Sequence, residues 1–132
     1  MNTIPINKLK EYFENHPEVI LVYLFGSSIT GKQHPGSDVD IAVLFNQRPD
    51  FEKILKMQGD LEKIVIKDVD LVVLNDAPPV LRKQVLSKGR EIFCRDNKTK
   101  YYFIIKTMNE YDDLKYYRKI LERNIQEKPI LA

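Results

Sequence analysis

Two short apolar runs, separated by a polar segment with glycines, limit most strongly what this chain can fold into. The runs are Val19–Phe25 and Val39–Phe45, and their β-branched and aromatic residues predict buried strands. The segment between them, 26–38, is rich in turn-forming residues. The second run starts with two aspartates one residue apart, Asp38 and Asp40. Their like charges repel each other, which indicates that something of opposite charge belongs beside them.

Helical and strand patterns alternate along the rest of the chain. This alternation predicts an α/β fold with a small mixed β-sheet flanked by helices and a long C-terminal helix. The expected helices lie at 7–13, from Asp50 to about Ile66, at 78–87 and from about 97 to 128, and the further strands at 69–74 and 91–94.

The length and the composition narrow the class of protein. With 132 residues and no linker-like or low-complexity tract, we expect one domain over 1–132, with a core at about 1–96 and a C-terminal helix at about 97–128. The one cysteine, Cys94, excludes an internal disulfide and a cysteine metal cluster, and favours a reducing, cytoplasmic location. The apolar runs are too short to cross a bilayer, so no membrane partner is expected.

The charge is distributed unevenly. The formal net charge is +2, too small to predict a nucleic-acid partner. Residues 1–81 hold 8 Lys and Arg against 12 Asp and Glu, whereas residues 82–132 hold 13 against 7. The basic C-terminal part is either a solvated helix face or a surface that meets an anionic ligand or an acidic partner.

Aspartates at the start of two strands predict a shared cation site. Residues i and i+2 of a strand point to the same face, so Asp38 projects with Asp40, and Asp68 projects with Asp70. If these strands are neighbours, three carboxylates converge at one edge of the sheet. An oxygen-only ligand set of this kind suits Mg²⁺ or Mn²⁺ bound together with the phosphates of a nucleoside triphosphate.

The Gly26-Ser27 pair fits the same chemistry. Glycine allows a sharp turn and a close approach of the backbone to a phosphate, and the amides from Ser27 onward can bind an anion. Each motif alone is weak, because Gly-Ser turns and Asp-x-Asp strand starts are frequent. The combination of a strand, Gly-Ser, ten residues, Asp-x-Asp on a second strand and a later Asp on a third is far more specific.

Gly26-Ser27, ten residues and Asp38-Val39-Asp40 resemble the signature of the DNA polymerase beta-like nucleotidyltransferase superfamily. The whole chain is similar to its minimal single-domain (MNT) branch. The resemblance runs from the first helix to about Asp96 and includes the stretches 69–72 and 86–93.

The resemblance implies a role for each matching residue. Asp38 and Asp40 would hold two Mg²⁺ ions, and Asp70 would bind the catalytic metal and help deprotonate the acceptor hydroxyl. Gly26 and Ser27 would bind the β- and γ-phosphates of ATP. The implied nucleotide-binding set is Gly26, Ser27, Ser28 and Ser37.

The resemblance also implies a partner. MNT proteins are typically encoded beside HEPN proteins as antitoxins, and they transfer AMP from ATP to a tyrosine of the cognate HEPN ribonuclease, which silences it. A hetero-oligomer or a homodimer is the expected assembly. Many relatives carry arginines where this chain has Ser28 and Thr30, so two phosphate-binding cations are lost. Lys32 and His34 lie in the same loop as substitutes.

Two other functions stay open from the sequence. One is a small-molecule nucleotidyltransferase of the antibiotic-modifying type, which usually needs an added helical domain or a dimer. The other is a non-catalytic antitoxin that acts by steric cover, which the missing arginines favour and the three carboxylates oppose. Apolar and aromatic residues recur at helical spacing near the C-terminus and predict core or partner contacts rather than an RNA-stacking platform: Tyr101, Ile104, Ile105, Met108, Tyr111, Leu114, Tyr117, Leu121 and Ile125.

Overall fold

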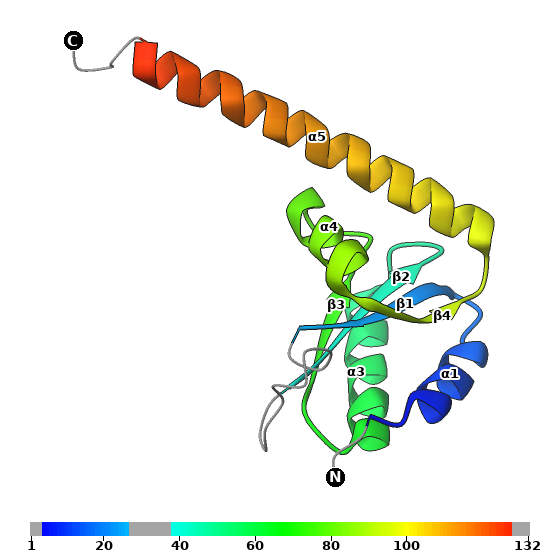
Figure 1. The fold of residues 1–132 in the computed structure, drawn as a ribbon. Helices are drawn as coiled ribbons and strands as arrows, with labels where there is room; N and C mark the ends of the chain where they lie inside the picture. Colours follow the sequence, from blue (N-terminus) through cyan, green and yellow to red (C-terminus); the bar gives the residue numbers. More distant parts are fainter. Residues whose placement is uncertain (1–3, 27–37, 128–132) are drawn as a thin grey trace.

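A computed structural model describes residues 4–26 and 38–127, with side chains described as far as residue 124. The helices and strands agree with the predicted elements to within a few residues (Figure 1). In chain order they are α1 (Ile6–Glu14), β1 (Val19–Phe25), β2 (Val39–Phe45), α3 (Phe51–Val65), β3 (Val69–Val73), α4 (Pro79–Lys88), β4 (Arg90–Cys94) and α5 (Asn97–Glu127).

The four strands form one mixed sheet in the order β3-β2-β1-β4. β1 pairs antiparallel with both β2 and β4, whereas β2 and β3 run parallel. The predicted α/β class with a small mixed sheet and a long C-terminal helix is therefore confirmed. Because β2 and β3 are parallel neighbours, their two aspartate-bearing starts lie at the same edge of the sheet.

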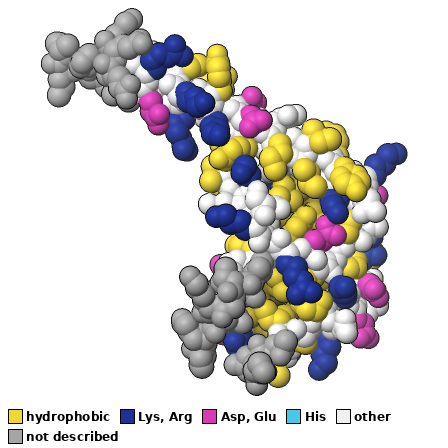
Figure 2. Space-filling model, in the orientation of Figure 1, with side chains coloured by type: hydrophobic (Ala, Val, Ile, Leu, Met, Phe, Trp, Pro, Cys, Tyr) yellow, Lys and Arg dark blue, Asp and Glu magenta, His cyan; other side chains and the backbone are white. Residues whose placement is uncertain are grey.

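Helices cover both faces of the sheet. α1 and α3 pack on one face through buried side chains that include Leu9, Phe13, Met57 and Leu61. α4 and α5 cover the other face, where Val85 and Phe103 join a second buried cluster with side chains of β1 and β2. Figure 2 shows that hydrophobic side chains also gather at the surface along α5 and over the body beneath it.

The ends of the helices follow local signals in the sequence. Asp50 caps α3, because its side chain accepts a hydrogen bond from the backbone N–H of Lys53 at 2.8 Å. Ile66 ends α3 in the left-handed conformation with φ of 56°, which a β-branched residue rarely adopts. Gly89 ends α4.

The long helix α5 buries a narrower face than its apolar spacing suggests. Phe103 and Thr107 are buried, whereas Tyr101 and Ile105 are exposed. The apolar positions therefore include a second, outward set, because α4 and the sheet cover only one side of the helix. No helix in the described part of the chain is both long enough and apolar enough to span a membrane.

Candidate active site

The sheet brings two of the predicted carboxylates side by side. In the parallel pairing of β2 with β3, Asp40 lies opposite Asp70. In the antiparallel pairing of β2 with β1, Asp40 lies opposite Phe25, the last residue of β1. Asp38 directly precedes β2 and is exposed. The three acidic residues therefore share the edge where β2 and β3 begin and β1 ends.

Gly26 lies directly against this carboxylate pair. Its φ of 71° is in the left-handed region, where a side chain is unfavourable. A Cβ atom at Gly26 would overlap the Oδ2 atom of Asp40. Two reasons therefore favour glycine directly after β1. The backbone turns there in the left-handed conformation, and Asp40 occupies the space that a side chain would need.

The electrostatics of the site centre on Asp40. Partial burial raises the pKa of Asp40 above its ordinary value, and the negative charges of Asp70 and Asp38 raise it further. A hydrogen bond from protonated Asp40 to Asp70 acts in the same direction. A bound cation would relieve this repulsion between the carboxylates. The same conclusion follows from the spacing of the aspartates in the sequence.

The possible metal ligands at this edge are carboxylate oxygens that repel one another, and such ligands suit a hard divalent cation. Among residues 4–26 and 38–127, no three acidic, histidine or cysteine side chains already form a group that could hold a metal ion. Asp40 and Asp70 therefore form the assembled part of the site. Asp38 is exposed, and it is near enough for its charge to act on Asp40.

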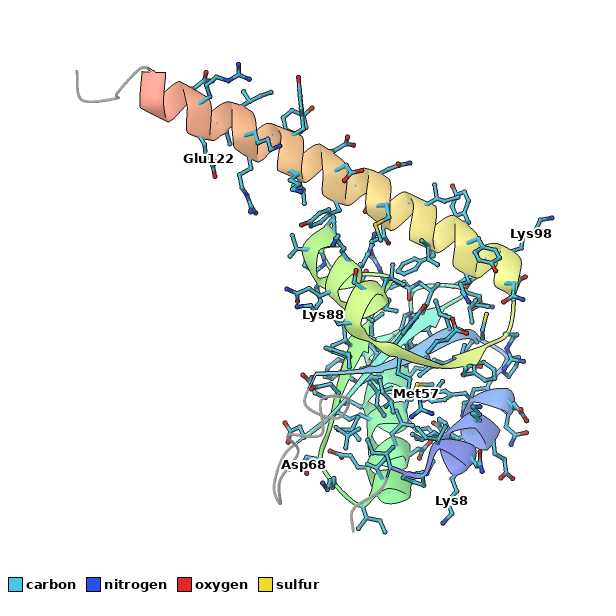
Figure 3. All side chains as sticks on the ribbon, in the orientation of Figure 1. Lys8, Met57, Asp68, Lys88, Lys98 and Glu122 are labelled. Atoms are coloured by element: carbon cyan, nitrogen blue, oxygen red, sulfur yellow. The ribbon has the colours of Figure 1, made fainter. Side chains whose placement is uncertain are left out.

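Asp68 lies at the same edge of the sheet, but its observed contact is a backbone hydrogen bond between two strands. Its backbone carbonyl accepts a hydrogen bond from the N–H of Val39 at 2.8 Å and so ties the starts of β2 and β3 together. Its side chain is exposed at the edge of the molecule (Figure 3). The geometry thus pairs Asp70, rather than Asp68, with Asp40.

The other predicted nucleotide-binding residues, Ser27, Ser28 and Ser37, lie outside the described residues, as does the loop that carries Thr30, Lys32 and His34. Of the predicted nucleotide-binding set, Gly26 is the one that the structure describes.

Sequence reasoning missed Arg82, which holds α4 and α5 over the sheet. Its guanidinium donates to the backbone carbonyls of Leu74 and Asn75 at 3.1 Å each, and its Nη1 atom lies 2.7 Å from Glu110 of α5. The side chain is almost fully buried. A charged residue in the middle of the short helix α4 was the available signal, but its partners lie too far along the chain to be identified from spacing.

The fold and this edge of the sheet define a nucleotidyltransferase. The family model described as polymerase beta nucleotidyltransferase matches residues 7–98. The chain therefore belongs to the polymerase beta nucleotidyltransferase family.

Relatives of the chain narrow the family to its minimal members. The protein adenylyltransferase MntA of Shewanella oneidensis is 35% identical over 108 residues, which cover 82% of this chain and 77% of the relative. A crystal structure of a toxin–antitoxin with AMP-PNP contains a chain that is 32% identical, with a TM-score of 0.78, over 92% of this chain and 98% of that one.

A further solved structure is the tri-AMPylated HEPN toxin of Shewanella oneidensis in complex with MNT antitoxin. It matches with a TM-score of 0.73 and 29% identity, over 96% of this chain and 99% of that one. The resemblance drawn from the sequence, to MNT proteins of toxin–antitoxin pairs, is thereby confirmed. The match extends along nearly the whole chain.

Proposed function

We propose that this chain is an antitoxin that transfers AMP from ATP to a tyrosine of a cognate HEPN toxin and thereby neutralises it. The observation that carries the proposal is the pairing of Asp40 with Asp70 against the left-handed Gly26. The similarity to a protein adenylyltransferase supports AMP as the transferred group and protein as the acceptor. The similarity to chains in toxin–antitoxin complexes supports a HEPN toxin as the partner.

Asp38, Asp40 and Asp70 would hold two Mg²⁺ ions, with Mn²⁺ as an alternative. Bound there, the ions would neutralise the carboxylates and stabilise negative charge on the reacting phosphate groups. The bound ions would matter most for the protonation state of Asp40. Burial and two neighbouring carboxylates all disfavour its charged form, and a cation would favour that form.

The residues of the chain would divide the work between binding and proton transfer. Gly26, Ser27, Ser28 and Ser37 would bind the triphosphate, and the absence of a side chain at Gly26 would let the phosphates approach the backbone. The tyrosine oxygen would form a bond to the α-phosphorus while the bond from that phosphorus to the bridging oxygen breaks, and pyrophosphate would leave. Asp70 would help to take the proton of the hydroxyl group. Because the reaction would consume ATP, we expect the protein to act in the cytoplasm.

The test combines this chain, ATP, Mg²⁺ and the HEPN protein encoded beside it, with the intact mass of the HEPN protein as the readout. We expect a gain of one or more AMP units and loss of ribonuclease activity. Asp70→Asn should abolish the gain. Asp68→Asn is the matched control, two residues away on the same strand start, and should keep it.

Other outcomes would replace the proposal. A tight complex that silences the ribonuclease with no mass gain, and that Asp38→Asn leaves intact, would establish a non-catalytic antitoxin. That alternative draws on Ser28 and Thr30, positions at which the resemblance to the family would lead us to expect phosphate-binding arginines. AMP transfer to a free antibiotic, and to no protein, would establish a small-molecule enzyme.

A further inference from the structure

The second half of α5 extends past the body of the molecule (Figure 1). Every residue from 112 to 119 and from 121 to 124 is exposed, whereas Phe103 and Thr107 in the first half are buried. Arg82 and Lys83 of α4 contact α5 near the point where this changes, through Glu110 and the ring of Tyr111. At 1.5 Å per residue, residues 112–124 extend for about 20 Å.

The face of α5 that packs on the body continues along this projecting half. Leu121 follows Phe103 by eighteen residues, which is five turns of 3.6 residues, so both point the same way. Leu114 follows Thr107 by seven residues and falls within about 20° of it. Leu114 is 43% exposed and Leu121 is 62% exposed. Together with Tyr117 and Arg118, which flank them, they form what we call the overhang face: Leu114, Tyr117, Arg118 and Leu121.

The projecting half of α5 lies on the same side of the molecule as the catalytic edge. In Figure 3 the labelled residues Asp68, at the edge that carries the carboxylates, Lys88, at the end of α4, and Glu122, on the projecting half of α5, lie on one side. Lys98, at the start of α5, lies on the other. In Figure 2 the projecting helix extends beyond the body on this side.

We propose that the overhang face is the docking surface for the protein substrate, separate from the catalytic edge. The inference rests on the proposed function, because it takes the occupant to be the protein that carries the acceptor tyrosine. A protein seated beneath the projecting helix would contact the overhang face while its tyrosine reaches Asp70. The helix would then select the substrate, and the carboxylate edge would act on it.

The size of the surface favours such a partner over a second copy of this chain. A stable interface involves roughly 20–30 residues on each side. One face of residues 112–124 supplies only a few, so two crossed overhangs would bury too little. A protein that also contacts α4 and the catalytic edge makes up the difference. The apolar pair Leu114 and Leu121 would pack on an apolar strip of the partner.

The charge of the same side defines the partner further. Lys83 and Lys88 of α4 and Arg118 of the overhang face are basic residues available near this surface, whereas Arg82 is buried and paired with Glu110. The complementary surface of the partner is an apolar strip bordered by aspartates or glutamates. This matches the excess of basic residues after position 81.

The experiment compares two variants of the full chain that place the same new charge on opposite sides of one helix. Leu121→Glu alters the overhang face, and Tyr116→Glu is the matched control, because Tyr116 is 64% exposed and points away from that face. With the HEPN protein encoded beside this chain as probe, we expect Leu121→Glu to raise the Kd of the complex and the KM for that protein about tenfold or more, with kcat and the affinity for ATP unchanged. Tyr116→Glu should change each by less than about twofold.

Three outcomes overturn the inference. The first is an unchanged Kd and KM for Leu121→Glu, and the second is an equal loss for Tyr116→Glu. The third is a dimer of this chain alone, seen by sedimentation, that Leu121→Glu dissociates. If the wild-type chain binds the probe but transfers no AMP, the proposed function fails, whereas the Kd comparison still tests the docking surface. A Kd raised by Arg118→Glu would support the acidic border of the partner.

Discussion

Replacing Gly26 with alanine should damage both the stability and the activity of this protein. The backbone at Gly26 has φ of 71°, and alanine in this left-handed region costs roughly 1–2 kcal/mol. The new Cβ atom would also overlap Oδ2 of Asp40, so one of the two must move. For a domain of this size, the backbone term alone corresponds to a fall in Tm of roughly 4–8 °C.

The loss of activity follows from the displacement of Asp40. This carboxylate lies opposite Asp70, and it can avoid a methyl group at Gly26 only by rotating or by moving the start of β2. A misplacement of about 1 Å at a reacting centre can lower a rate on the order of 10²-fold. We therefore expect Gly26→Ala to lower kcat for AMP transfer by about that factor.

Gly59→Ala provides the control, with the opposite sign. Gly59 is inside α3, and a Cβ atom there meets no atom within 4 Å. Alanine should therefore stabilise the helix by roughly 0.5–1 kcal/mol and leave the activity unchanged. Calorimetric unfolding and a rate assay of both variants test the reasoning. A Gly26→Ala protein with the Tm and kcat of the wild type would show that Asp40 does not lie against Gly26.

Three further substitutions test other contacts of the fold. The backbone of Ile66 is in the left-handed conformation, and its side chain is 86% exposed. Ile66→Gly should therefore raise the free energy of unfolding in urea by roughly 1 kcal/mol. A lower value than that of the wild type would contradict strain at this helix end. Arg82→Met should lower the free energy of unfolding by about 3 kcal/mol with an unchanged m-value, because two carbonyls and Glu110 lose their buried partner. A change under about 1 kcal/mol would refute this reasoning. Partial burial raises the pKa of Asp60, but hydrogen bonds from Tyr12 and Lys56 outweigh it and hold that pKa below its ordinary value. This stabilisation is present above about pH 4 and is lost as the pH falls through the folded pKa, so the stability deficit of Tyr12→Phe should shrink below about pH 4; a deficit that is constant with pH would refute it.

The strands and the carboxylate edge were predictable because their signals are local. Each strand is a short apolar run with clear boundaries, and the aspartates sit at fixed offsets from the strand starts. Alternation along a strand then decides which side chains share a face. The sequence alone left open whether the strands were neighbours, and the parallel register of β2 with β3 supplies that step.

The packing of α5 was not predictable in the same way. Helical spacing identifies apolar positions, but Tyr101 and Phe103 differ in burial only because α4 and β1 reach one side of the helix. The contacts of Arg82 depend likewise on Glu110, 28 residues further along the chain. Such pairings follow from the final arrangement of the elements and leave no local pattern in the sequence.

Two features of this chain oppose its own stability, and both lie on the same side of the molecule. Asp40 is held beside two like charges, and Leu114 and Leu121 project apolar surface into solvent from an extended helix. Local rules of protein structure are typically violated where function requires it. A cation and a triphosphate would relieve the first conflict, and an apolar partner surface would relieve the second. An enzyme whose acceptor is a small molecule would need the carboxylate cluster but not the exposed leucines. The exposed leucines therefore favour a protein as the acceptor.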